Sequence, residues 1–172
     1  MNGRLDATRT PPVLRFERRL PHPVARVWRA ITDPEDLRNW FPGVPNFTLE
    51  AGAAFVVEGD AGGSGRIVEL DPPRLLAFSW GEDVLRFELT PDGDGCLLTF
   101  THAFGDLSRA AQTAAGWELC LDRLAAQVAG EPIGERASLE RWPQLHERYA
   151  EAFGLDPEVG RRAYAARPAR QR

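Results

Sequence analysis

The stretch that decides the fold is residues 84–130, VLRFELTPDGDGCLLTFTHAFGDLSRAAQTAAGWELCLDRLAAQVAG. Polar and apolar side chains alternate along Val84–Thr90 and again along Cys96–Phe104, so each segment is predicted to be a strand with one apolar face. The turn residues PDGDG between them predict a hairpin. A sheet of this kind is covered on its apolar face and exposed to water on the other.

The second half of the same stretch predicts what covers the sheet. Asp106 or Ser108 can cap a helix that runs to about Gly130. Within it, apolar residues recur at spacings of three and four and form one continuous stripe, which is typical of a helix packed on a core. The sequence therefore predicts an α+β fold in which a curved antiparallel sheet wraps round a long C-terminal helix.

The residues before 84 supply the remaining elements of this plan. Val13–Leu20 alternates like a strand, and two helices follow at about residues 24–31 and 35–40, with Asp33 as a cap between them. Three further strands are predicted at residues 54–58, 66–70 and 75–80. Because Val68 and Leu70 flank Glu69, the face on which Glu69 lies stays ambiguous.

The chain divides into three parts on this reading. Residues 1–12 are expected to be a flexible arm, residues 13–130 the folded domain, and residues 131–172 a helical extension with a basic tail. In the extension, residues 135–153 are predicted to be helical, with Pro143 kinking or splitting the helix. The arginine-rich stretch from Gly160 is expected to be a frayed terminus.

Composition argues against several classes of protein. The net charge of -4 gives no general attraction for nucleic acid or an anionic membrane, and no apolar run is long enough to span one. Cys96 and Cys120, in a chain without a signal peptide, predict a reduced, cytoplasmic protein. No cluster of metal-ligating residues is visible, so neither a metal nor a cofactor is expected.

Three segments in this order resemble a known family. They are VARVWRAITDPEDLRNWF (24–41), GRIVELDPPRLLAFSW (65–80) and FELTPDGDGCLLTFTHAF (87–104), followed by Gly116-Trp117 at the start of the closing helix. Together they are similar to proteins related to the activator of Hsp90 ATPase, in the START-like or Bet v 1-like (SRPBCC) superfamily. The resemblance covers about residues 13–129 and implies a helix-grip fold with an elongated cavity between sheet and helix. Superfamily members bind lipids, sterols, polyketides or plant hormones, some are cyclases or dehydratases, and the eukaryotic namesake is a co-chaperone.

The candidate ligand-binding residues are those that alternation directs into this cavity, together with two expected at its mouth, Trp40 and Phe41. The inward residues are Phe78, Trp80, Phe87, Phe100, His102, Trp117 and Leu121. Each aromatic residue could instead be ordinary core. His102 could form one hydrogen bond with a ligand or could be satisfied by the backbone, and it could pair with Glu69 as an acid and base if their strands bring them together. His22 and His146 are expected to be solvated.

Three hypotheses about function follow. The first is a protein that binds a small apolar or amphipathic molecule in the cavity, with no catalytic residue assigned. The second is an interaction module similar to the Hsp90 co-chaperone, with a protein partner or a second copy of the chain as its target. The third is a cyclase or hydrolase that uses His102 as acid or base. Binding ranks above catalysis because a single inward titratable residue is less than most active sites need.

Overall fold

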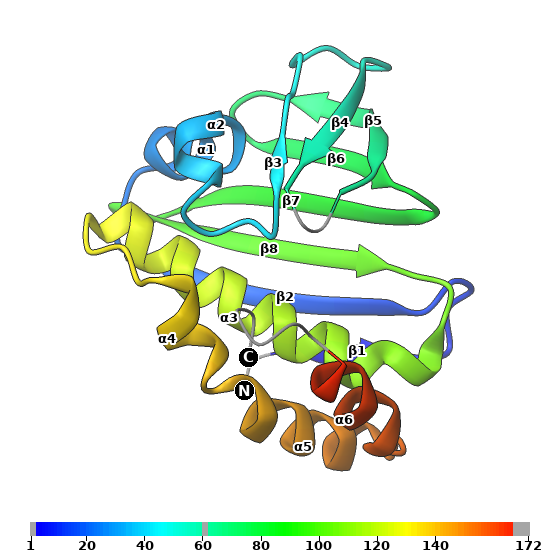
Figure 1. Cartoon of the computed structure of the whole chain (residues 1–172). Coiled ribbons are helices and arrows are strands. Elements are labelled where there is room, and N and C mark those ends of the chain that lie inside the picture. Colours follow the sequence, from blue (N-terminus) through cyan, green and yellow to red (C-terminus); the bar gives the residue numbers. More distant parts are fainter. Residues whose placement is uncertain (1–2, 60–61, 167–172) are drawn as a thin grey trace.

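The computed structural model describes residues 3–59 and 62–166. An antiparallel sheet curves round one long helix, α3, and three further helices lie on the other side of that helix (Figure 1). The eight strands are ordered β1-β2-β8-β7-β6-β5-β4-β3 across the sheet. Their bounds are β1 Arg4–Asp6, β2 Val13–Leu20, β3 Val44–Pro45, β4 Ala54–Glu58, β5 Ser64–Asp71, β6 Leu75–Trp80, β7 Asp83–Asp92 and β8 Gly95–Ala103. The predicted α+β helix-grip fold is confirmed.

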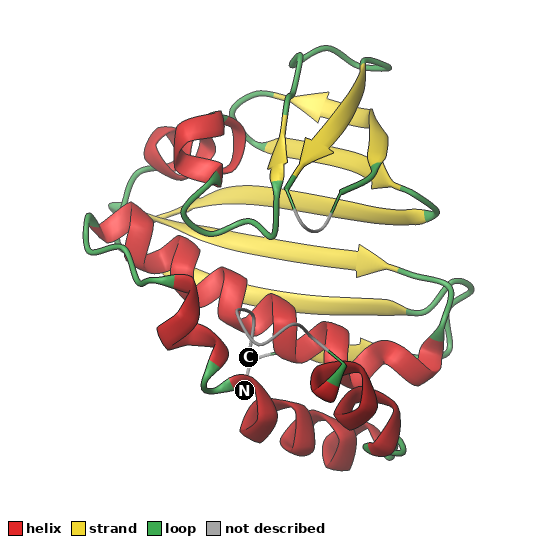
Figure 2. Cartoon of the chain, in the orientation of Figure 1, coloured by secondary structure: helices red, strands yellow, loops and turns green. Residues whose placement is uncertain are grey.

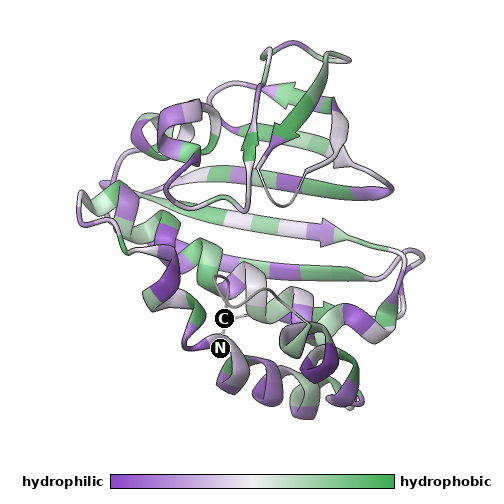
Figure 3. Ribbon diagram, in the orientation of Figure 1, coloured by the Kyte–Doolittle hydropathy of each residue, from purple (hydrophilic) through white to green (hydrophobic). Residues whose placement is uncertain are grey.

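The hairpin of β7 and β8 is the centre of the sheet. Its register runs from Asp92 opposite Gly95 to Val84 opposite Ala103, with Phe87 opposite Phe100. Gly93 has a φ of 61°, which suits glycine at the turn. Figure 3 shows hydrophobic and hydrophilic residues alternating along β7, which is the pattern that places one face of the strand in the core.

Two short helices connect β2 to the rest of the sheet. Helix α1 spans Val24–Thr32 and α2 spans Pro34–Leu37 (Figure 2). The Asp33 carboxylate accepts hydrogen bonds from the backbone N–H groups of residues 35 and 36, so the predicted cap is confirmed. Helix α2 ends at Leu37, earlier than residue 40, because the chain then turns to bury Trp40.

The covering helix begins at a cap and ends at a glycine. The Asp106 carboxylate accepts the backbone N–H of Ser108, and a 3₁₀ turn, η1 (Leu107–Arg109), leads into α3 (Ala110–Ala129). Gly130 ends α3 in the left-handed conformation, with a φ of 83°. The apolar stripe of α3 lies on the sheet and is buried, as its spacing predicts.

Aromatic side chains fill the centre of the space between the sheet and α3. The rings of Phe78, Phe87 and Phe100 are almost completely buried and contact one another, with centroids 6.1 Å and 4.7 Å apart along the series. The buried Trp40 indole lies on Phe87 and donates its N–H to the Ala30 carbonyl oxygen, 2.8 Å away. The expected elongated cavity is therefore occupied by the chain's own rings along this part of its length.

Within the described residues, both terminal segments contain regular secondary structure. The N-terminal segment contains β1, which pairs with β2. Just before β1, the Gly3 backbone N–H donates a hydrogen bond to the Tyr149 hydroxyl, 2.9 Å away. Part of the segment expected to be a flexible arm, Arg4–Asp6, thus continues the sheet, while residues 1–2 lie outside the described residues.

The extension, described up to residue 166, contains three helices, α4 Glu135–Leu139, α5 Trp142–Phe153 and α6 Glu158–Ala165. Pro143 stands in the first turn of α5, where it splits the predicted helix rather than bending it. Helix α6 occupies much of the stretch expected to be a frayed tail; the end of that stretch, residues 167–172, lies outside the described residues. None of the described helices combines the length and apolar character needed to span a membrane.

Candidate functional site

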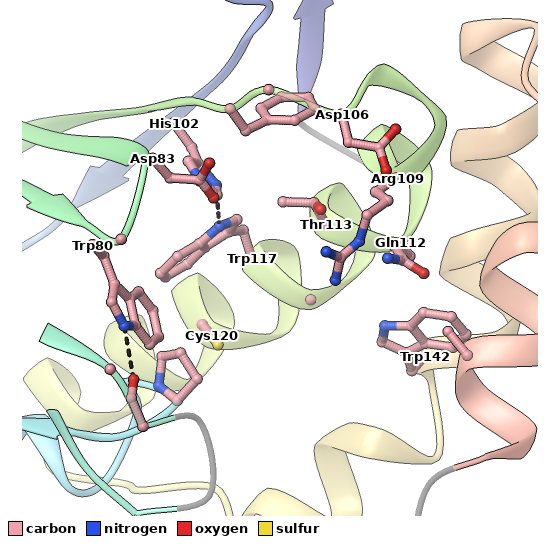
Figure 4. A pocket seen from close by; sticks show the side chains of 18 of the residues that line it. Trp80, Asp83, His102, Asp106, Arg109, Gln112, Thr113, Trp117, Cys120 and Trp142 are labelled. Carbon is pink, nitrogen blue, oxygen red and sulfur yellow. Dashed lines mark hydrogen bonds and ion pairs between the residues drawn. The ribbon is translucent and has the colours of Figure 1, made fainter.

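A pocket of about 720 Å³ lies at one end of the domain, between the sheet, the first half of α3 and helix α6 (Figure 4). Most of its walls are aromatic or small residues, and a few polar groups interrupt them. The lining residues that matter below are Trp80, Asp83, His102, Asp106, Arg109, Gln112, Gly116, Trp117, Cys120, Trp142 and Tyr164. They come from β6, β7, β8, α3, α5 and α6 and from the connections between them.

One wall is built around Trp80, at the end of β6. Its indole N–H donates to the Gly62 carbonyl oxygen at 2.8 Å, which ties the β4–β5 connection to the pocket. Gly63 lies directly against the ring, because a Cβ at that position would come within 2.7 Å of the indole nitrogen. The φ of Gly63, 102°, also favours glycine, so both the close approach to the ring and the backbone conformation require glycine at this position.

A hydrogen-bonded chain of three side chains forms the polar part of the site. The Asp83 carboxylate lies 3.0 Å from His102 Nε2, and the Trp117 indole N–H donates to His102 Nδ1 at 2.8 Å. His102 and Trp117 are buried, while Asp83 is partly exposed to the pocket. The three come from β7, β8 and α3, so this chain connects the sheet to the covering helix.

The partner of each imidazole nitrogen fixes the tautomer of His102. An indole N–H can only donate, so Nδ1 must be the acceptor, and the ring hydrogen is on Nε2, where it is donated to Asp83. Both nitrogens are thus engaged within the protein. In this arrangement His102 orients Trp117 and Asp83, and a proton exchange with a ligand would first require one of these bonds to break.

The outer wall comes from the C-terminal extension. The rings of His146, Trp142 and Tyr164 form a parallel stack, with neighbouring centroids 4.8 Å apart on both sides of Trp142. His146 is buried with 1% exposure, which corrects the expectation that it is solvated. Gly160 of α6 rests on its edge, since a Cβ there would lie 2.6 Å from Cδ2 and closer still to Nε2.

Cys120 of α3 also faces the pocket but is not a reactive thiol. Burial raises the pKa of Cys120 to about 12, so the side chain stays protonated near neutral pH. Among the residues that the structure describes, no three His, Cys, Asp or Glu side chains gather to hold a metal ion.

Comparison with known proteins assigns the family. Residues 21–129, more than half of the chain, match the model of the family described as activator of Hsp90 ATPase homolog 1-like protein. The chain belongs to this family. The predicted membership, within the SRPBCC helix-grip superfamily, is confirmed. A search of curated proteins finds no match.

Several solved structures have the same fold as this protein. The crystal structure of CalU16 from Micromonospora echinospora is 28% identical and superposes with a TM-score of 0.72, over 88% of this chain and 94% of CalU16. DynU16, from the dynemicin biosynthetic locus, is 29% identical with a TM-score of 0.63, over 70% of this chain and 48% of DynU16. EF2215 from Enterococcus faecalis, described as of unknown function, is 19% identical with a TM-score of 0.74, over 88% of this chain and 89% of EF2215, and shows the fold alone.

Three of the nine predicted site residues line the pocket of this protein. They are Trp80, His102 and Trp117. The other six are buried in the core and do not line the pocket: Trp40, Phe41, Phe78, Phe87, Phe100 and Leu121.

The two residues expected at the mouth, Trp40 and Phe41, are 0% and 4% exposed, because the turn after α2 folds them inward. Phe41 lies behind the pocket wall, with its ring 5.4 Å from that of Trp80 and 5.7 Å from that of Trp117.

Glu69 does not join His102. A bulge between Ile67 and Glu69 leaves both Val68 and Glu69 exposed, and the Glu69 carboxylate binds Arg86 on the outer face of the sheet. The carboxylate that meets His102 is Asp83. The sequence holds a signal for it: Leu85 lies opposite His102, and Asp83, two residues earlier, shares its face.

Arg109, Gln112, Trp142 and Tyr164 were also not predicted as site residues. Arg109 ends η1 and Gln112 lies in the first turn of α3, and Trp142 and Tyr164 belong to the extension. Their place in the site depends on how α5 and α6 pack against α3, and the spacing of residues within each helix does not reveal this.

Proposed function

We propose that this protein binds a small apolar or amphipathic molecule in the pocket between β6, α3 and α6. The observation that carries the proposal is the lining: three of the five tryptophans in the chain, Trp80, Trp117 and Trp142, surround one pocket of about 720 Å³. Pockets of this size, largely apolar with a few placed polar groups, are typical of small-molecule sites.

The pocket has the size and chemistry to hold a molecule of two or three fused or linked rings. Burying about 200 Å² of apolar ligand surface would contribute about 5 kcal/mol before the entropic cost of binding. The neighbours support a role with small molecules, since DynU16 comes from a biosynthetic locus and is 29% identical.

Binding is favoured over catalysis by the state of His102. Both of its nitrogens are hydrogen-bonded within the protein, one to Asp83 and one to Trp117. These bonds hold the Trp117 ring in place. An acid–base role would need a ligand that displaces Asp83 or Trp117 from the imidazole.

Fluorescence titration with two naphthalene probes tests the proposal. Anilinonaphthalenesulfonate and phenylnaphthylamine both brighten in apolar sites, and at least one is expected to bind saturably with one site per chain. Trp80→Leu should weaken that binding by about tenfold, through loss of ring contact and buried area. Trp28→Leu is the matched control, because Trp28 lies on α1 and does not line the pocket.

Two outcomes would overturn the proposal. One is the absence of saturable binding by either probe to the folded protein. The other is an equal loss of binding in Trp28→Leu and Trp80→Leu when circular dichroism shows that both variants are folded.

A further inference from the structure

Among the described residues, three charged side chains line the pocket, and two of them are already engaged. Asp83 is hydrogen-bonded to His102 at 3.0 Å. Asp106 accepts the backbone N–H and the hydroxyl of Ser108, at 3.0 Å and 2.7 Å, and so serves as the cap before α3. Arg109 is different, because its guanidinium has no hydrogen-bond or ion-pair partner within residues 3–59 and 62–166.

A polar group near Arg109 also lacks a hydrogen-bond partner among the described residues. Gln112, three residues further along, has its side-chain oxygen buried without a hydrogen-bond partner in the part of the chain that the structure describes. Figure 4 shows both side chains, Arg109 at the end of η1 and Gln112 in the first turn of α3, between Trp117 and Trp142. An amide can present either an acceptor or, when turned over, a donor to the same point. The positive end of the 20-residue helix α3 lies here as well and adds to the attraction for a negative group.

From this arrangement we infer that the pocket selects flat aromatic anions, with the carboxylate or sulfonate of the ligand on Arg109 and its rings among Trp80, Trp117 and Trp142. The inference rests on the proposed function and adds the chemical class of the ligand. A guanidinium fork matches the two oxygens of a carboxylate, and charge-assisted bonds of this kind are stronger than neutral ones. Trp80 and Trp117 supply ring surface for the aromatic part, whereas both faces of Trp142 are covered by His146 and Tyr164, so Trp142 bounds the pocket without stacking on the ligand.

The two naphthalene probes separate the charge from the rings. Anilinonaphthalenesulfonate carries a sulfonate, and phenylnaphthylamine has the same aromatic skeleton without it. The wild-type protein is expected to bind the sulfonate at least about tenfold more tightly, the effect of one charge-assisted contact. Arg109→Gln should remove this preference while changing the affinity for phenylnaphthylamine by less than about twofold.

Arg148→Gln is the matched control for Arg109→Gln. Arg148 is an exposed arginine of α5 that does not line the pocket, so the substitution changes the net charge equally at a different place. It should leave the preference for the sulfonate intact. Because Arg109 is exposed, Arg109→Gln should fold, and the ratio of the two wild-type affinities tests the inference without any variant.

The outcomes distinguish this inference from the proposed function. Equal or tighter binding of phenylnaphthylamine by the wild-type protein would overturn the anion selectivity and leave the binding function standing. The anion selectivity would also be overturned, with the binding function still standing, if Arg148→Gln reduced the preference for the sulfonate as much as Arg109→Gln does. Failure of both probes to bind would instead overturn the binding function itself.

Discussion

Replacing Gly160 by alanine should detach helix α6 from the domain without unfolding the rest. Gly160 is buried against His146, and a Cβ would lie 2.6 Å from Cδ2 and 2.8 Å from Cε1 of that ring. The ring has little room to retreat, because it is 1% exposed and its face is stacked on Trp142 at 4.8 Å. The strain is therefore expected to be relieved by movement of α6.

The magnitudes favour local release. Overpacking of this kind costs about 1–3 kcal/mol, and alanine returns about 1 kcal/mol through its higher helix propensity. The net loss is therefore about 0–2 kcal/mol. Helix α6 is held in part by the Tyr164–Trp142 stack, which contributes about 0.5–1.5 kcal/mol. The ion pairs of Arg161 with Glu147 and Glu158 are exposed and add little. The strain is thus about as large as the docking energy of the helix.

Hydrogen exchange measured by mass spectrometry is the assay for this prediction. Peptides covering α6 should exchange much faster in Gly160→Ala, while peptides of β7 and β8 should keep their protection. Probe binding should weaken several-fold, because α6 carries Ala163 and Tyr164 of the pocket wall. Gly116→Ala is the control for hydrogen exchange only, since Gly116 lines the pocket: a Cβ on this helical glycine would meet no neighbouring atom within 4 Å, so alanine should stabilise α3 slightly. Unchanged exchange in α6, or faster exchange everywhere, would refute the reasoning.

Two further predictions concern other pocket residues. Trp117→Phe removes the N–H that His102 Nδ1 accepts, so the free energy of unfolding measured in urea should fall by about 1–3 kcal/mol; an unchanged value would show that this bond contributes nothing. Because the pKa of Cys120 is about 12, iodoacetamide at pH 8 should alkylate it on the order of a hundredfold more slowly in the native protein than in urea. Its native rate should keep rising from pH 8 to pH 10, whereas the rate in urea levels off near the ordinary pKa, and equal native and denatured rates would contradict the burial argument.

The sheet and the covering helix could be predicted because their signals are local and repeated. Strands β2 and β6 have the bounds that alternation predicts, Val13–Leu20 and Leu75–Trp80. In contrast, β1 has three residues, too few to show a period, and its place is set by pairing with β2. Helix α6 looks like a charged tail in sequence because the contacts that dock it, Gly160 against His146 and Tyr164 against Trp142, join residues of different helices.

The site could be predicted only in part, again where the signals are local. Trp80, His102 and Trp117 lie on faces that alternation and helical spacing identify, so the inner wall of the pocket was accessible to sequence reasoning. The bulge in β5 turned Glu69 outward, and no sequence period announces a bulge. The central aromatic residues could not be told from pocket residues either, because a ring that fills a cavity and a ring that lines one occupy the same faces.

One wall of the pocket lies inside the part of the chain that matches the family and the other lies outside it, and this difference affects which part of the chain determines ligand selectivity. The inner wall, with Trp80, Asp83, His102 and Trp117, lies within residues 21–129, the part that matches the family. The outer wall, with Trp142 and Tyr164, lies beyond it. A family domain without the extension would lack the wall that Trp142 and Tyr164 form near Arg109, which is itself exposed. On our proposal, the extension completes the outer wall of the site, so selectivity should change when α6 is displaced even though every residue of 21–129 stays the same.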